Sequence, residues 1–400
     1  MNSQLITVPG SSTESALKSA PIKDDGRSAD EAHLSLVMLV GRQDEPTDAV
    51  RDYVTRLTEA LRRQGVDCQT YELRWDERGW IVAMAALWKH SRAWAGRWVV
   101  LQYTALMWSR RGFPLLLPLA LKILRVRRCR VGVVFHDGYA AAGSRWIDRI
   151  RALLQERLMR HFARNASRAI YPVALRSACW PQSGQHSCEF IPVGANVPSF
   201  DELHQSGCIP GHKIPTVAVF GIPTWPAAQT REVTAIVEAL RRASLKIREL
   251  QLVVVGRGAT QAESLLRRGL SGTGVSVRVV GVRSGAEISS ALCSSDVFLF
   301  VRGGLSTRRG SGLAALGCGL PVVAYRGEET GFPLTDAGIV FVPEGDVELL
   351  GDELARVLLD RELRLQMSER NLAVFRQWFS WDQIASRWIG VLRLNKELSK

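Results

Sequence analysis

The sequence predicts an α/β protein in which two doubly wound, mostly parallel sheets are joined by a linker. Apolar runs of strand length alternate with segments of helical periodicity, first over residues 34–194 and again over 217–342. Between these two series, residues 198–215 are polar and show no periodic pattern. The 400 residues also exceed the roughly 150 of an average domain, which favours two domains over one.

The first half opens with a strand, a helix and a second strand. The apolar run at 34–40 ends at Gly41, and residues 48–64 then repeat apolar side chains at helical spacing. This turn lacks the pattern G-x-G-x-x-G, so the dinucleotide fingerprint is missing. Further strands are expected at 66–73, 98–103, 131–135, 168–172 and 190–194, with helices at 80–94, 114–124 and 145–164.

The second half repeats the alternation and ends in helices. Strands are expected at 217–220, 251–255, 275–280, 296–301, 321–324 and 338–342, with helices at 230–242, 261–268, 286–294, 346–359 and 362–375. A last helix reaches about residue 394, and its apolar face, with Trp388 and Ile389, needs a partner surface. We therefore expect a disordered tail at 1–30, domains at 31–200 and 216–376, a linker at 201–215, and a segment 377–400 that crosses back to the first domain.

Charge and cysteine content limit the class of protein. The chain has 52 basic and 39 acidic residues, a net charge of +13, which favours anionic partners such as nucleotides, phospholipid head groups or nucleic acid. Seven scattered cysteines without a C-x-x-C pattern disfavour a disulfide framework or zinc site and fit a reducing compartment. No secretory signal opens the chain, and Arg110-Arg111-Gly112 interrupts its longest apolar region, so a cytoplasmic protein without a transmembrane helix is expected.

Residues 296–325 form the stretch around which the second half is organised. The order strand, loop, helix, strand places Ser306 and Thr307 as N-cap residues of a helix that opens there, followed by Arg308 and Arg309. Helix N–H groups and two guanidiniums suit a phosphate or a diphosphate. The alternative is a capped helix with two solvated arginines.

Three features follow strands and should therefore meet at one cleft. They are Gly41, the segment His136-Asp137-Gly138, and the turn 306–311. His136 is either a structural histidine or a group beside the reacting centre. Asp137 is expected to cap the following turn.

The second half resembles the retaining glycosyltransferases of family 4 (group 1), which have the GT-B fold. The resemblance rests on the order and spacing of short segments: 253–258, 279–282, 295–299, 313–324 and 338–343, and in the first half 191–196 and the strand before His136. It implies two Rossmann-like domains facing across a cleft, with His136 as a catalytic group. It also implies a donor-binding set of Gly41, Gly221, Val282, Arg283, Ser306, Thr307, Arg308, Arg309, Gly310 and Ser311.

The activity implied by the resemblance is transfer of a sugar from a nucleotide-sugar donor to a glycan, a lipid-linked or another acceptor, with retention. The nucleotide sugar is a substrate, so no cofactor is expected, and the absence of D-x-D argues against a bound metal. The positions of the family's paired glutamates, spaced E-x7-E, hold Ser306 and Ala314. This departure keeps open a non-catalytic nucleotide-sugar-binding or partner protein, and a sugar-nucleotide epimerase is a further alternative. Nucleic-acid binding is not expected, because no recognition motif is present.

The window 78–136 is basic and rich in tryptophan. It contains eleven arginines and lysines, five tryptophans and no acidic residue. Two interpretations remain: a solvated face over buried tryptophans, or a surface for an anionic membrane or a lipid-phosphate acceptor. The second would place the protein at the inner face of the membrane.

Overall fold

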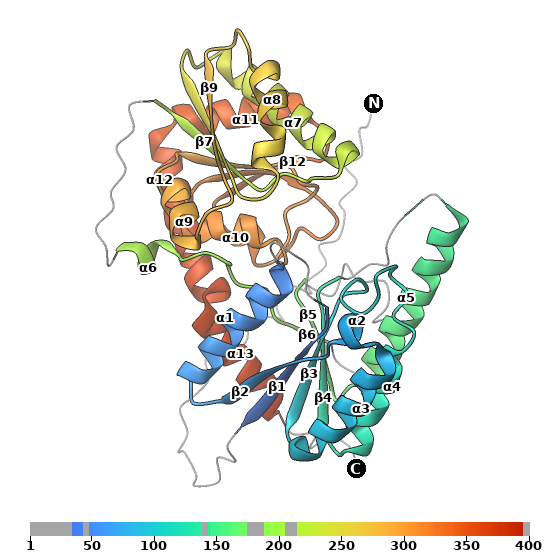
Figure 1. Cartoon of the computed structure of the whole chain (residues 1–400). Coiled ribbons are helices and arrows are strands. Elements are labelled where there is room, and N and C mark those ends of the chain that lie inside the picture. The colour runs from blue at the N-terminus through green and yellow to red at the C-terminus, as the bar shows by residue number, and fades with distance from the viewer. Residues whose placement is uncertain are drawn as a thin grey trace, which may run out of the picture. The chain divides into compact units, whose positions relative to one another are not determined.

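The computed structural model describes residues 34–42, 48–137, 143, 145–173, 188–204 and 214–394. The predicted tail at 1–30, most of the predicted linker and the last six residues lie outside these ranges. Two parallel six-stranded sheets form the framework of the described chain (Figure 1). Among the described residues, no helix is both long and apolar enough to cross a membrane.

The first sheet has the strand order β2-β1-β3-β4-β5-β6, and every pairing in it is parallel. Its strands are β1 (Ser35–Val40), β2 (Asp67–Glu72), β3 (Trp98–Tyr103), β4 (Arg130–Phe135), β5 (Arg168–Tyr171) and β6 (Cys188–Phe190). The helices of this half are α1 (Ala49–Arg63), α2 (Trp75–Arg78), α3 (Trp80–His90), α4 (Leu117–Val126) and α5 (Trp146–Asn165).

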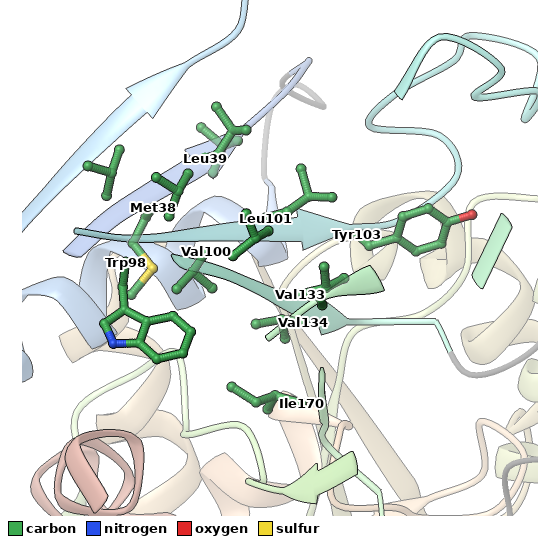
Figure 2. Close-up of a cluster of buried hydrophobic side chains, with 14 of the residues drawn as sticks. Met38, Leu39, Trp98, Val100, Leu101, Tyr103, Val133, Val134 and Ile170 are labelled. Atoms are coloured by element: carbon green, nitrogen blue, oxygen red, sulfur yellow. The ribbon is translucent and has the colours of Figure 1, made fainter. Parts of the chain in front are cut away.

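The central strands of the first sheet are buried on both faces, which explains their continuous apolar sequence. All six residues of β3 are buried, as are the last five of β1. Figure 2 shows this core, where Met38, Val100 and Leu101 lie on adjacent strands beside Trp98 and Val133.

The second sheet has the order β12-β11-β10-β7-β8-β9 and is also entirely parallel. Its strands are β7 (Thr216–Phe220), β8 (Leu250–Val255), β9 (Val275–Gly281), β10 (Val297–Phe300), β11 (Val322–Arg326) and β12 (Ile339–Pro343). Its helices are α7 (Pro226–Ser244), α8 (Ala259–Gly269), α9 (Gly285–Cys293), α10 (Gly310–Gly317), α11 (Val347–Leu359) and α12 (Arg361–Val374). A short helix, α6 (Phe200–His204), falls where the sequence indicated only an aperiodic linker.

The chain leaves the second half through a π-helical turn at Phe375–Phe379 and ends its described part with α13 (Trp381–Arg393). The indole of the buried Trp388 on α13 donates to the hydroxyl of Tyr53 on α1 over 3.1 Å. Arg63 forms a 2.9 Å ion pair with Asp382. These contacts place α13 against α1 of the first half, where the apolar face of the last helix is covered.

Candidate active site

Each sheet has one switch point, a pair of neighbouring strands from which the chain continues toward opposite edges of the sheet. In the first sheet this point lies between β1 and β3, and in the second between β7 and β10. Loops leaving such a pair of strands diverge and open a crevice at their carboxyl ends, where α/β proteins bind ligands. The loops after β1, β3, β7 and β10 are therefore the place to look for a site.

A pocket of about 720 Å³ lies at the ends of β1, β3 and β7, and no residue of the loop after β10 lines it. Its first-half wall comes from the loops after β1, β3 and β4 and from the start of α1, and its second-half wall from the ends of β7, β8 and β9 and from α9. The lining includes Arg42, Asp48, Asp52, Thr104, Leu106, Asp137, Asn196, Phe220, Gly256, Arg257, Val282 and Arg283. Of the predicted donor set, this lining contains Val282 and Arg283.

Gly41 allows the loop after β1 to pack closely against the loop after β3, at the pocket wall formed by the first half. A Cβ at this position would lie 2.7 Å from the carbonyl oxygen of Met107, so a side chain would push the two loops apart. The next residue, Arg42, donates its backbone N–H to the same carbonyl over 3.0 Å. Gly41 thus brings the loop after β1 against the loop after β3 without itself lining the pocket.

Two neighbouring side chains at the end of β4 have different surroundings. The half-buried His136 lies with Nε2 2.8 Å from Oε1 of Gln102 and with its ring edge against Tyr53. Burial lowers the pKa of His136 to about 4, so its imidazole is neutral at pH 7. Asp137, by contrast, lines the pocket, and desolvation raises its pKa although the residue remains accessible to solvent. Of these two residues, Asp137 is among those that line the pocket and His136 is not.

Gly221 ends β7 at a φ of +76°, a backbone conformation that favours glycine. A Cβ there would lie 3.3 Å from a guanidinium nitrogen of Arg302, the second residue after β10. Arg302 in turn pairs with Glu232 of α7 over 3.4 Å. The turn after β7 is thus covered by a paired arginine that the sequence analysis did not single out.

The structure corrects the expected helix start at Ser306. Helix α10 begins at Gly310, four residues later, with Arg309 at its N-cap position. Ser306 and Thr307 are buried rather than capping, and the hydroxyl of Thr307 donates to the carbonyl of Pro172 in the first half. The Thr307 carbonyl accepts from the N–H of Val193 over 3.2 Å. Because Thr307 uses its hydroxyl and carbonyl groups for contacts with the first half, and the buried hydroxyl of Ser306 has no partner among the described residues, the N-cap signal in the sequence was misleading.

Arg308 and Arg309 differ in their partners. Arg308 forms a 2.7 Å ion pair with Glu329, which lies in the loop after β11. No hydrogen bond or ion pair joins the guanidinium of Arg309 to another described residue, and its Nε is buried. Burial, with the nearby charge of Arg308, lowers the pKa of Arg309. Since an unpaired buried cation is costly, Arg309 is the group here that would gain most from an anion.

Gly310 and Ser311 form the first turn of α10. A Cβ on Gly310 would lie 3.4 Å from Oδ1 of Asn196, which itself lines the pocket. The N-terminal turn of α10 therefore lies beside the pocket without being part of its lining. N–H groups of a first turn lack partners within the helix and are suited to anions.

Sequence reasoning missed several charged residues that the structure gathers around Arg309. The charges of Glu232, Arg302 and Glu329 all act on this guanidinium, although they come from α7, the loop after β10 and the loop after β11. The sequence could have indicated Arg302, because this residue follows a buried strand. Glu232 inside a helix and Glu329 in an irregular loop carried no comparable signal.

Comparison with known proteins gives a family match within the second half of the chain. Residues 216–360 match a family model described as "Glycosyl transferases group 1". A search of curated proteins gave no match.

Solved structures resemble the chain over nearly its whole length. Anabaena Alr3699/HepE, solved in complex with UDP and glucose, aligns with a TM-score of 0.60 at 12% identity and covers 90% of this chain and 99% of its own. Sucrose-phosphate synthase from Thermosynechococcus elongatus aligns at 0.61 and 17% identity, covering 90% and 98%. A glycosyltransferase from Rickettsia africae aligns at 0.64 and 11%, covering 91% and 100%. At these identities the likeness establishes the fold: two Rossmann-like domains in the GT-B arrangement.

Proposed function

We propose that this protein is a glycosyltransferase that moves a sugar from a nucleotide-sugar donor to an acceptor hydroxyl. In this reaction the bond from the anomeric carbon to the diphosphate breaks, and a bond to the acceptor oxygen forms. The acceptor loses its proton, and the nucleoside diphosphate leaves. The observation that carries the proposal is the pocket at the carboxyl ends of both sheets, beside the unpaired Arg309 of a group 1 domain. The related Anabaena protein was solved with UDP and glucose, which is consistent with such a donor.

The donor diphosphate is proposed to lie between the first turn of α10 and Arg309. Negative charge grows on the diphosphate as the bond to the sugar breaks, so a guanidinium and N–H groups fixed in advance would stabilise the transition state. Gly221, Ser306, Thr307 and Arg308 would shape this subsite rather than all touch the donor. Val282 and Arg283, which line the pocket, remain the proposed contacts of the nucleotide base.

The acceptor side of the site is proposed to use the end of β4. Asp137 provides a carboxylate at the pocket wall, and its raised pKa suits proton exchange. His136 stays the proposed group near the reacting sugar. It is neutral at pH 7, so it can donate or accept a hydrogen bond there but carries no charge.

Finer features of the reaction are also part of the proposal. They are retention at the anomeric carbon, independence from a metal ion, and an acceptor that is a glycan or is lipid-linked. We propose that the protein works in the cytoplasm, at the inner face of a membrane, because of the cations on its first half.

A direct assay tests the proposal. The protein is incubated with radiolabelled UDP-glucose and other nucleotide sugars, with and without glycan and lipid-linked acceptors. Transfer of label with release of nucleoside diphosphate is expected, unchanged by EDTA, and magnetic resonance of the product gives its anomeric configuration. Binding of the donor without any turnover would favour instead the non-catalytic alternative, to which Ser306 and Ala314 at the expected glutamate positions already point.

A further inference from the structure

Two cysteines of the second half meet where two neighbouring helices end. Cys293 is the last residue of α9, Cys318 directly follows α10, and these helices pack together (Figure 1). The sulfur of Cys318 lies 3.9 Å from the carbonyl oxygen of Ser289, which is one helical turn before Cys293. A hydrogen bond also joins the two cysteine side chains. Since both are free thiols, the structure shows a reduced pair in contact.

The two thiols differ in access to solvent and in acidity. Cys318 is 6% exposed, whereas Cys293 is only partly buried at the edge of the same apolar cluster. The hydrogen bond from Cys318 lowers the pKa of Cys293. The same hydrogen bond, together with burial, raises the pKa of Cys318. Cys293 is therefore the thiol that ionises first and that a small oxidant reaches first.

The other cysteines in the described part of the chain have the opposite properties. Cys68, Cys129 and Cys188 are buried in the core of the first half. Burial raises the pKa of each of them, to about 11 for Cys129 and to about 12 for Cys188. A protonated and shielded thiol is a slow nucleophile. Among the described cysteines, Cys293 alone combines access to solvent with a lowered pKa.

We infer that Cys293 and Cys318 form a peroxide-sensitive thiol pair that closes reversibly to a disulfide. The thiolate of Cys293 attacks hydrogen peroxide, whose O–O bond breaks, and Cys293 becomes a sulfenic acid while the leaving hydroxide takes up a proton as water. The thiol of Cys318 then attacks this sulfur. The S–S bond forms, the S–O bond breaks, and a second water leaves. Two molecules of a small thiol reduce the pair again by exchange and become a disulfide themselves.

The pair lies away from the proposed donor site. Gly285 and Ile288 line the pocket from the beginning of α9, whereas Cys293 stands at the other end of this helix. Helix α10 likewise has its first turn beside the pocket and Cys318 after its last residue, Gly317. The disulfide therefore ties the far ends of both helices and uses no residue of the proposed donor site. Its formation is independent of the proposed function.

Peptide mapping of the full chain tests the pair. The protein is reduced, freed of reductant, treated with hydrogen peroxide, alkylated with iodoacetamide and digested with trypsin. Trypsin separates the two cysteines into the peptides 284–302 and 310–326, which contain no other cysteine. Mass spectrometry of the parent should find these two peptides joined, lighter than their sum by two hydrogen atoms. Dithiothreitol should restore the separate peptides.

Variants assign the order of the two steps. In C318A the second thiol is missing, so Cys293 should stop at the sulfenic acid, which dimedone traps, and should go on to the sulfinic acid in excess peroxide. C293A should leave Cys318 unoxidised, because that thiol is buried and protonated. The matched control C129A removes a buried thiol of the first half and should form the cross-link like the parent. Thermal unfolding checks that all variants are folded.

A second measurement needs no variant. In the reduced parent, iodoacetamide should alkylate Cys293 about tenfold or more faster than Cys129, because alkylation requires an accessible thiolate. The inference is overturned if the two cysteines react equally fast, or if peroxide leaves the peptides 284–302 and 310–326 separate in the folded parent. It is also overturned if Cys293 resists peroxide in C318A or pairs with a different cysteine in the parent.

Discussion

The two halves of the chain place their charges differently, although both are Rossmann-like and parallel. In the second half, arginines lie at the strand ends in a partly buried network with Glu232 and Glu329. In the first half, exposed cations lie on α3, α4 and α5, and the strand ends at the pocket carry both Arg42 and Asp137. The difference shows that the positive charge is distributed in two ways: partly buried at the strand ends of the second half, and exposed on the helices of the first half.

The largest effect is expected at the carboxylate of the first half. Asp137→Asn should lower turnover by about a hundredfold or more, because a group at the pocket wall that exchanges a proton is worth that much. Affinity for the nucleotide should change little, since Arg309 of the second half is the proposed phosphate-binding group. His136→Ala, measured beside it, should also reduce turnover more than affinity if His136 lies near the sugar. Steady-state kinetics and calorimetry separate the two quantities. Unchanged turnover in both variants would remove the end of β4 from the mechanism.

Loss of Arg308 should affect stability rather than binding. Arg308→Ala leaves Glu329 without its 2.7 Å partner, and breaking a largely buried pair from one side costs about 3 kcal/mol in unfolding free energy. The double variant Arg308→Met/Glu329→Met should recover most of this loss, because no unpaired charge remains. Urea unfolding measures both. If Arg308→Ala is as stable as the parent but binds nucleoside diphosphate weakly, the ion pair between Arg308 and Glu329 opens when the ligand binds. Arg308 would then contact the phosphates, as proposed for Arg309.

Arg309→Ala should weaken nucleoside-diphosphate binding by roughly ten- to a hundredfold. A hydrogen bond to a charged group contributes about 1.5–3 kcal/mol, and this guanidinium has no partner of its own to keep it from the ligand. Stability should stay the same or rise slightly, since the variant removes a desolvated cation that has no ion-pair partner among the described residues. Calorimetric titration gives the affinity. Binding as tight as in the parent would place the phosphate site elsewhere.

The smallest effect concerns the pH dependence of stability. Burial lowers the pKa of His136 to about 4, so its contribution to stability is complete above pH 6.5 and is lost as the pH falls toward 4. Between pH 7 and pH 5 the parent should lose about 2 kcal/mol from this group. His136→Gln should lose less over the same interval, because glutamine does not titrate. Unfolding curves at the two pH values make the comparison, and equal losses would show that His136 is not desolvated as described.

The sequence by itself determined the α/β class, the division into two halves and nearly all strands. Parallel strands buried on both faces are continuous apolar runs, and such runs at 36–40 or 253–255 leave little choice of structure. Gly41 and Gly221 were expected only as donor-binding residues by resemblance, whereas the close approach at Gly41 and the positive φ at Gly221 came from the structure. The class of donor followed only from a resemblance that lies mainly in the second half.

Only the tertiary structure decided which charged residues meet. The helix predicted from Ser306 begins at Gly310, because Thr307 uses its hydroxyl on the other half of the chain instead of on a helix end. Arg308 is paired and Arg309 is not, a difference set by Glu329, which is 21 residues from Arg308 in the sequence. Local sequence fixes strands and helices through the periodicity of burial. The partners of a charge depend on loops that come together only when both sheets are folded.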